Sequence, residues 1–154
     1  MAHGLRPASA DDRDFLLQVY ASTREEELRL LDWSAEQKAA FVRMQFEAQD
    51  AYYREHYEPA TFDVIEVDGV PAGRLYVARW ENELRIVDIA LLPQYRGRGI
   101  GTDLLRALLD EASRAGKRVS IHVERNNPAR RLYERLGFRP VGEQGVYLLL
   151  EASP

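Results

Sequence analysis

Three glycines and two arginines fall within six residues of this chain, in a pattern suited to binding an anion. They are Arg96, Gly97, Arg98, Gly99 and Gly101. An amphipathic helix is predicted directly after them, and at its start the backbone N–H groups lack acceptors and the peptide dipoles add about half a positive charge. Glycines let the backbone approach an anion, and guanidinium groups donate paired hydrogen bonds to phosphate oxygens. The pattern therefore predicts a phosphate-binding loop rather than an ordinary strand-to-helix turn.

Two common phosphate-binding motifs fit this loop poorly. The P-loop requires a lysine before its Ser or Thr, whereas Thr102 directly follows Gly101. The dinucleotide fingerprint has the form G-x-G-x-x-G, and the three glycines here are one residue short of it. Glu124, the acid that would hold a ribose, is only loosely at the required spacing. The rest of the chain must therefore identify the anion.

A second block, residues 127–138, supplies that identification. It runs Asn127-Pro128-Ala129-Arg130-Arg131-Leu132-Tyr133-Glu134-Arg135-Leu136-Gly137-Phe138. It resembles the N-x-x-A-x-x-L-Y-x-x-x-G-F segment of the GNAT superfamily of acyl-CoA-dependent N-acetyltransferases, with the alanine one place early, as in that family's N-P-A form. The loop Arg96–Gly101 resembles the family's R/Q-x-x-G-x-G/A signature, and Leu91-Leu92-Pro93 resembles its strand end. The resemblance covers residues 62 to 150; the first sixty residues match only in outline.

The resemblance implies acetyl-CoA as the cofactor and assigns residues to bind it. In GNAT-like folds two parallel strands splay apart, which would leave unpaired backbone groups at Leu91 and Leu92 for the amides of pantetheine. The pyrophosphate would then reach the glycine-rich loop. The residues assigned to the cofactor on this basis are Leu91, Leu92, Arg96, Gly97, Arg98, Gly99, Ile100, Gly101, Thr102, Asn127 and Arg130. For Asn127 the alternative is simple capping of its own helix.

Acetylation of an amine requires a neutral amine, a stabilised oxyanion and a proton for the leaving thiolate. Tyr133 matches the family's tyrosine, and a tyrosine pKa of about 10 keeps the phenol protonated at neutral pH, so Tyr133 is the predicted proton donor. The alternative is a core aromatic residue beside Leu132 and Leu136. A backbone N–H near Leu91 would stabilise the oxyanion.

The general base is left open by the sequence. Asp88 is an acid inside an apolar strand, where an unpaired charge would be costly. It therefore either pairs with an arginine, such as Arg85 or one on a neighbouring strand, or takes part in catalysis, and it joins Tyr133 as a candidate catalytic residue. His122 and Glu124 are the alternative bases.

Two strands and one helix must position these residues. The apolar run Leu84–Leu92 predicts a central strand that ends before Pro93, and Val119–Val123 predicts a second strand. The helix between them ends at the C-cap signal Ala115-Gly116. Because a strand–helix–strand crossover joins parallel neighbours, these two strands should lie side by side and parallel.

The other strands are predicted to be antiparallel. Thr61–Val67 and Val70–Trp80 form a hairpin at Asp68-Gly69 and continue into the central strand as a meander. Phe138–Val141 and Gly145–Leu150 close the sheet after a helix that begins at Pro128.

The first sixty residues are predicted to be largely helical. An edge strand at Gly4–Ala8 precedes a helix over Ala10–Ala21 with Ser9 as N-cap, and Thr23–Leu31 is left open as a short helix or a mobile loop. A long helix runs from Ser34, which forms a capping box with Gln37, to His56. Two side-chain groups here have alternative interpretations. Glu25, Glu26 and Glu27 form either a solvated face or an acidic rim for an amine substrate, and Gln45 and Gln49 are either wet border residues or part of a polar pocket.

The predicted fold class is therefore mixed α/β (α+β). Residues 1–154 should form a single GNAT-like domain with a mostly antiparallel central sheet, one splayed parallel strand pair and helices on both faces.

Composition excludes several other classes of protein. The chain has 154 residues, 45% of them hydrophobic, and a net charge of −4, which predicts one soluble domain with no nucleic-acid partner. The absence of cysteine excludes disulfides and thiolate chemistry, and three widely spaced histidines give no metal-ligand pattern. No apolar run is long enough for a membrane segment, so a cytoplasmic location is the default expectation.

These observations favour an N-acetyltransferase that transfers an acetyl group from acetyl-CoA to a primary amine of a small molecule or a peptide N-terminus, by direct attack on the thioester. A GNAT-shaped acyl-CoA sensor without turnover is the alternative. A dinucleotide-binding domain is disfavoured, because the chain is short and has one parallel crossover. A homodimer could form through Gly145–Leu150 if that strand lies at an edge.

Overall fold

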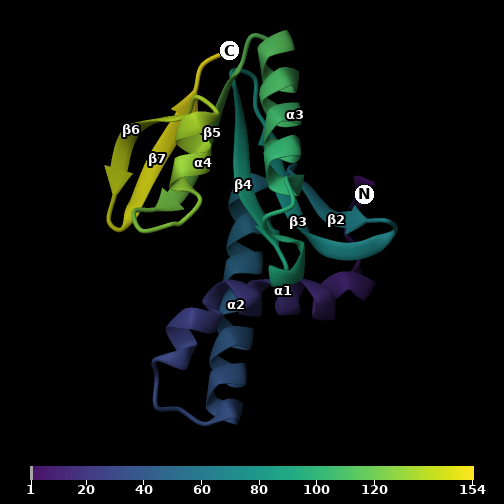
Figure 1. Cartoon of the computed structure of the whole chain (residues 1–154), viewed down its shortest axis with the longest axis vertical. Helices are drawn as coiled ribbons and strands as arrows, with labels where there is room; N and C mark the ends of the chain where they lie inside the picture. Colours follow the sequence, from purple (N-terminus) through teal and green to yellow (C-terminus); the bar gives the residue numbers. More distant parts are fainter. Residues whose placement is uncertain (1) are drawn as a thin grey trace.

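Seven strands form one sheet in the order β1-β2-β3-β4-β5-β7-β6 in the computed structural model, which describes residues 2–154 (Figure 1). Neighbouring strands are antiparallel except for β4 and β5, which are parallel. The strands are β1 (His3–Pro7), β2 (Thr61–Val67), β3 (Val70–Arg79), β4 (Glu83–Leu91), β5 (Arg118–Glu124), β6 (Arg139–Gln144) and β7 (Tyr147–Ala152). The helices are α1 (Arg13–Arg29), α2 (Ala35–Tyr57), α3 (Ile100–Arg114) and α4 (Arg130–Arg135), with short 3-10 turns at Ala10–Asp12 and Pro93–Tyr95.

Two hydrophobic cores lie on opposite faces of the sheet. The larger core joins β2–β5 and β7 to α3 and α4, with Ile86, Leu105 and Ile121 among its buried residues. The smaller core packs α1 and α2 against Val64 and includes Phe46. The predicted mixed α/β fold, with one parallel strand pair and helices on both faces, is therefore confirmed.

Local sequence signals located several element ends correctly. Ser34 Oγ accepts the Gln37 N–H at 3.1 Å while Gln37 returns a bond to the Ser34 N–H at 2.9 Å, so the predicted capping box forms. The β2–β3 hairpin turns at Asp68 and Gly69, where both residues have positive φ. These features depend on a few adjacent residues, which is why the sequence was sufficient to predict them.

Three element predictions were wrong or incomplete. The first helix begins at Arg13 after a 3-10 turn and continues to Arg29, so most of the segment left open at Thr23–Leu31 is helical. Helix α4 begins at Arg130 rather than at Pro128. Strand β7 lies between β5 and β6 and is not an edge strand, so its backbone is already paired on both sides and the dimer contact suggested for Gly145–Leu150 has no free edge to use.

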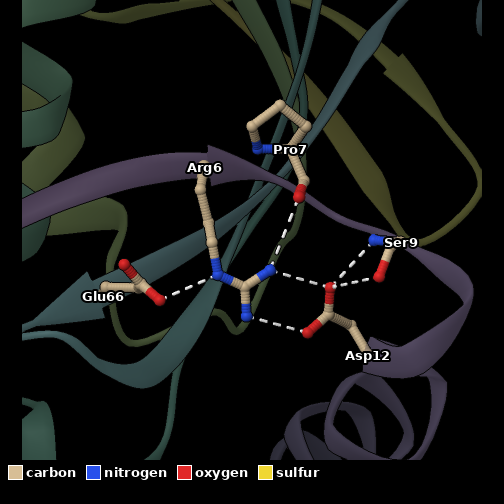
Figure 2. A network of polar contacts seen from close by, with 5 residues as sticks. All are labelled: Arg6, Pro7, Ser9, Asp12 and Glu66. Atoms are coloured by element: carbon tan, nitrogen blue, oxygen red, sulfur yellow. Dashed lines mark hydrogen bonds and ion pairs between the residues drawn. The ribbon is translucent and has the colours of Figure 1, made fainter.

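An ion-pair network fixes the start of α1 to the edge of the sheet (Figure 2). Arg6 on β1 donates to Glu66 on β2 at 2.8 Å and makes two bonds to Asp12, at 2.8 and 2.9 Å. Asp12 also accepts the Ser9 N–H at 2.8 Å, and Ser9 is the N-cap of the 3-10 turn that precedes α1, while Asp12 is the N-cap of α1 itself. The hydrogen bonds from Arg6 hold the pKa of Asp12 down, to about 2.

The parallel pairing of β4 and β5 is short. It covers Glu83↔Arg118 to Ile86↔Ile121 only, although β4 continues to Leu91 and β5 to Glu124. On the other side of β4, Asp88 is opposite Tyr76 but Ile86 is opposite Val77, so Val87 is an extra, bulged residue. A bulge bends and twists its strand. Strand β4 therefore turns away from β5 immediately after their last pair.

None of the helices within residues 2–154 is both long and apolar enough to cross a membrane.

Gly73 on β3 faces the end of β4, where the two strands approach very closely. A Cβ atom at this position would overlap the Ala90 carbonyl oxygen and lie 3.0 Å from Leu91 Cα. We expect Gly73→Ala to destabilise the protein by about 1–3 kcal/mol, because backbone atoms must move to relieve the overlap. Thermal unfolding should show a fall of roughly 3–10 °C. Gly4→Ala is the matched control, since a Cβ there meets nothing within 4 Å; equal melting temperatures for the two variants would contradict the close approach.

Candidate functional site

The end of β4 presents part of its backbone to the gap beside β5. The Leu92 N–H donates to the Ala72 carbonyl of β3 at 2.8 Å. Because successive strand residues direct their backbone groups to opposite sides, those of Ile89 and Leu91 face the gap. The Leu91 carbonyl accepts from Arg96 Nε at 3.0 Å. The prediction of unpaired groups was therefore wrong for the Leu92 N–H and the Leu91 carbonyl, while the Leu91 N–H faces the unpaired side.

The glycine-rich loop begins immediately after this strand end. Gly97 and Gly99 have φ values of 72° and 83°, which favour glycine over any residue with a Cβ. Gly99 is the N-cap of α3, and the Asp103 N–H makes the first helical bond, to the Gly99 carbonyl at 3.0 Å. The N–H groups of Ile100, Gly101 and Thr102 consequently have no acceptor in the helix, as an anion site at a helix start requires.

The arginines of the loop hold its shape and carry its charge. Arg96 bridges the Leu91 carbonyl and, at 3.4 Å, the Ser22 hydroxyl of α1. The Arg98 guanidinium lies over the Tyr95 ring, 5.8 Å from its centroid. The side chain of Ile100 is buried in the larger core, so only its backbone faces the loop. The site is thus a backbone cradle with two adjoining cations.

The residues predicted at the start of α4 are engaged with their own chain. Asn127 Oδ1 accepts the Ala129 N–H at 2.8 Å, which is the capping role given above as the alternative. Arg130 donates to the Arg125 carbonyl at 2.7 Å, and its Nε is buried without a partner among the described residues.

Tyr133 is the only predicted proton donor and is buried on α4. Its ring packs edge-on against Phe138 at a centroid distance of 5.6 Å. Its hydroxyl makes no hydrogen bond with any residue in the described range 2–154. Burial, with a smaller contribution from the charge of Asp88, raises the pKa of Tyr133 to about 12. The phenol is therefore protonated throughout the physiological range, and it lies within electrostatic reach of the other candidate catalytic residue.

Asp88 pairs with an arginine, but not with Arg85. Arg74 on β3 donates to the two oxygens of Asp88 at 3.2 and 2.8 Å, and the Tyr53 hydroxyl of α2 donates to Oδ2 at 2.8 Å. Arg74 is almost completely buried and also donates to Gln49 Oε1 at 2.9 Å. The carboxylate thus accepts three hydrogen bonds. Burial of the Tyr53 hydroxyl, together with the adjacent negative charge of Asp88, raises the pKa of Tyr53.

Arg74, Tyr53 and the role of Gln49 were not predicted from the sequence. The signal for Arg74 was the same one that singled out Asp88, a charge within an apolar strand. Two such charges on strands joined by a meander could have been proposed as partners. Their register could not be deduced, because it depends on the bulge at Val87.

The two alternative bases lie on the α1–α2 face of β5. His122 Nδ1 lies 3.3 Å from Arg85 Nη1, and burial together with the charge of Arg85 lowers the pKa of His122. Glu124 accepts from Arg24 of α1 at 3.4 Å. No group of three or more His, Cys, Asp or Glu residues within 2–154 is arranged to hold a metal ion.

Glu124 also borders a cavity of about 280 Å³ between α1, α2 and the ends of β5 and β7. The residues around it are Tyr20, Arg24, Glu27, Phe41, Val42, Gln45, Glu124 and Tyr147. Gln45 therefore lines a pocket, which is the second of the two interpretations given for it from the sequence. Of the three acidic residues suggested as a rim, Glu27 lines this cavity, while Glu25 lines a separate cleft of about 360 Å³ beside Leu92 and Pro93.

Removing the charge of Asp88 should leave Arg74 buried without its counter-ion. We expect Asp88→Asn to lower the free energy of unfolding by about 3–5 kcal/mol, the usual effect of breaking one side of a buried ion pair. Tyr53→Phe removes one hydrogen bond from the same carboxylate but keeps the ion pair, so it should cost only about 1 kcal/mol. Urea unfolding of both variants checks this, and a loss for Asp88→Asn no larger than for Tyr53→Phe would show that Arg74 does not depend on Asp88.

Comparisons with known proteins identify the family of this chain. Residues 24–138 match the model of the acetyltransferase (GNAT) family. A Bacillus subtilis protein with the provisional name ribosomal protein bS18-alanine N-acetyltransferase is 34% identical over 105 residues, 64% of this chain and 68% of that protein. An N-alpha-acetyltransferase of Sulfurisphaera tokodaii is 34% identical over 108 residues, 58% of this chain and 64% of that protein. The matched stretches thus span about two thirds of these relatives.

The fold also has close structural counterparts. The crystal structure of PaiA N-acetyltransferase from Thermoplasma acidophilum, in complex with coenzyme A, superposes with a TM-score of 0.74 at 18% identity and covers 100% of both chains. At this identity the likeness concerns the fold alone.

Proposed function

Since this chain belongs to the GNAT acetyltransferase family, whose reaction is N-acetylation with acetyl-CoA as donor, we propose that the gap between β4 and β5 is where the acetyl group is transferred. The resemblance inferred from the sequence, the enzyme class and the cofactor are confirmed at the level of the family. The roles of individual residues and the identity of the acceptor amine belong to the proposal.

The observation that carries the proposal is the end of the β4–β5 pairing at Ile86 and Ile121. Beyond it the backbone groups of Ile89 and Leu91 face a gap instead of a strand. A ligand that contains amides, as pantetheine does, can pair with such an edge as a short strand. The loop Arg96–Thr102 lies one turn beyond that edge, where its N–H groups and Arg96 would receive the pyrophosphate. These residues therefore fit the cofactor.

When bound, acetyl-CoA supplies a thioester carbon that a neutral amine attacks; the C–N bond forms, the C–S bond breaks, and the amide and the free thiol are the products. The Leu91 N–H is placed to donate to the carbonyl oxygen as negative charge develops on it. Tyr133 gives its proton to the sulfur and regains one from the nitrogen. Its raised pKa keeps that proton in place until the sulfur becomes basic.

Asp88 has a different part in this proposal from the general base considered above. Its two oxygens accept three hydrogen bonds from Arg74 and Tyr53, and protonation of this carboxylate would remove the charge that balances the buried Arg74. We assign it instead as a fixed negative charge that helps to keep Tyr133 protonated and that attaches α2 to β4.

The acceptor amine should enter from the α1–α2 face. The cavity lined by Arg24, Gln45, Glu124 and Tyr147 opens on that face, at the free end of β5. The acceptor is a primary amine of a small molecule or a peptide N-terminus; the relatives named above include enzymes of the second kind.

Tyr133→Phe tests the proposed proton donor. We expect kcat to fall by about 10²–10⁴, the usual contribution of general acid catalysis, while the affinity for acetyl-CoA changes less than about twofold. Tyr52→Phe is the control, because Tyr52 is a half-exposed tyrosine on α2, away from the gap. Thiol release measured by a colorimetric assay gives kcat. A kcat within threefold of the parent would remove Tyr133 from the mechanism, and cofactor binding by the parent without thiol release for any amine would favour the acyl-CoA sensor.

Arg96→Ala tests the phosphate site. A charge-assisted hydrogen bond to phosphate is lost, so the Kd for CoA should rise about 10- to 100-fold. Arg106→Ala removes an equal charge from an exposed position on α3 and should change the Kd little. In a thermal-shift assay the parent should gain roughly 5–10 °C with acetyl-CoA or CoA at about 100 times Kd, and nothing with NAD. Equal effects of the two variants would place the phosphates elsewhere.

A further inference from the structure

His122 has its tautomer imposed by a neighbouring arginine. Arg85 Nη1 lies 3.3 Å from His122 Nδ1. A guanidinium can only donate hydrogen bonds, so Nδ1 must be the acceptor and the imidazole proton must be on Nε2. The ring therefore offers a donor, not a lone pair, on its other side.

The arginine is itself held rigidly. Arg85 donates to Glu83 Oε2 at 3.1 Å and to Ser120 Oγ at 2.7 Å, and it lies over the Trp80 ring at 5.1 Å. Glu83 and Ser120 are both buried. The guanidinium consequently cannot turn away to free Nδ1. Partial burial of the ring and then the charge of Arg85 lower the pKa of His122, against a smaller opposite effect of Glu83, which agrees with a neutral ring.

The position of His122 on β5 is close to the cavity proposed for the acceptor amine. It is the first residue of β5 after the last pair with β4, and it is exposed. It shares a face with Glu124, two residues further, which borders the acceptor cavity with Tyr147. His122 therefore lies on β5 between the last pair with β4 and the cavity-lining Glu124.

Each candidate base already has a partner within the chain. Asp88 and Glu124 are ion-paired with Arg74 and Arg24, and the lone pair of His122 Nδ1 faces Arg85. Proton removal by any of these groups would work against those contacts, so an amine that arrives largely neutral is favoured. At pH 7.5 about a quarter of an α-amino group with a pKa near 8 is neutral, against about 0.1% of an alkylamine with a pKa near 10.4.

We propose that His122 donates its Nε2–H to the first carbonyl oxygen of the acceptor, and that the acceptor is the α-amino group of a polypeptide rather than a side-chain or alkyl amine. The inference rests on the proposed function and narrows it. It assigns His122 to substrate binding and not to base catalysis.

Two variants separate these roles. Gln at position 122 keeps both an acceptor for Arg85 and an amide donor but cannot remove a proton, whereas Ala keeps neither. With a hexapeptide that has a free N-terminus, His122→Gln should stay within about threefold of the parent in kcat/KM, and His122→Ala should lose about tenfold, mainly through KM. Comparable losses for both variants, expressed in kcat, would overturn the proposal in favour of a base.

The matched substrate is the same hexapeptide with an acetylated N-terminus and one lysine. At pH 7.5 the parent should prefer the free N-terminus by at least about 100-fold in kcat/KM, from the difference in neutral amine. Equal or better use of the lysine would overturn the inference while leaving the proposed function intact. Failure of the parent to release thiol with either peptide or with simple alkylamines would instead overturn the proposed function.

An independent readout does not need turnover. Nitrogen-15 spectra of the imidazole groups distinguish the two tautomers, and His122→Gln identifies the signal of His122 among the three histidines. The expected spectrum has the proton on Nε2 and a bare Nδ1. A proton on Nδ1 would contradict the contact with Arg85 and the proposal with it.

Discussion

A single extra residue in β4 determines the geometry on which the site depends. Val87 has no partner in the β3–β4 ladder, and it follows directly after Ile86, the last β4 residue paired with β5. The resulting bend parts two parallel strands that would otherwise bond along their length. It also reverses the alternation of β4, so that Asp88 lies with Arg74 on the α2 side, although regular alternation would place it with Ile86 in the larger core. The gap and the buried charge pair are therefore two results of one irregularity.

The buried guanidinium of Arg74 explains why α2 is fixed to the site. A cation removed from water requires several acceptors, and no single residue supplies them. Asp88 comes from the adjacent strand, and Gln49 comes from α2, while Tyr53 of the same helix binds the carboxylate. Helix α2, on the proposed acceptor side, is thus connected to β4, which faces the proposed cofactor gap, by the hydrogen bonds of this buried polar cluster.

The sequence was sufficient to predict what short segments determine. The Ser34–Gln37 capping box, the Asp68-Gly69 turn and the parallel crossover follow from neighbouring residues, and two motifs together identified the family. It could not give the partner of Asp88, because register and a bulge set that contact. It likewise left open whether the strand Gly145–Leu150 lies at an edge, because nothing in those residues states which strands they will join. Residue types predicted the chemistry; long-range pairing decided which of those residues are free to perform it.

The position of β7 has a consequence for how the molecule becomes active. The free half of β5 is ordered by its pairing with β7 alone, from His122↔Leu149 to Glu124↔Tyr147. Folding of this half is therefore non-local, and loop closure must precede the gain from these contacts. Without β7, the half of β5 that faces the proposed transfer gap has no ladder to hold it. In the proposed mechanism, catalytic competence therefore depends on β7, a strand that lies outside both sequence motifs.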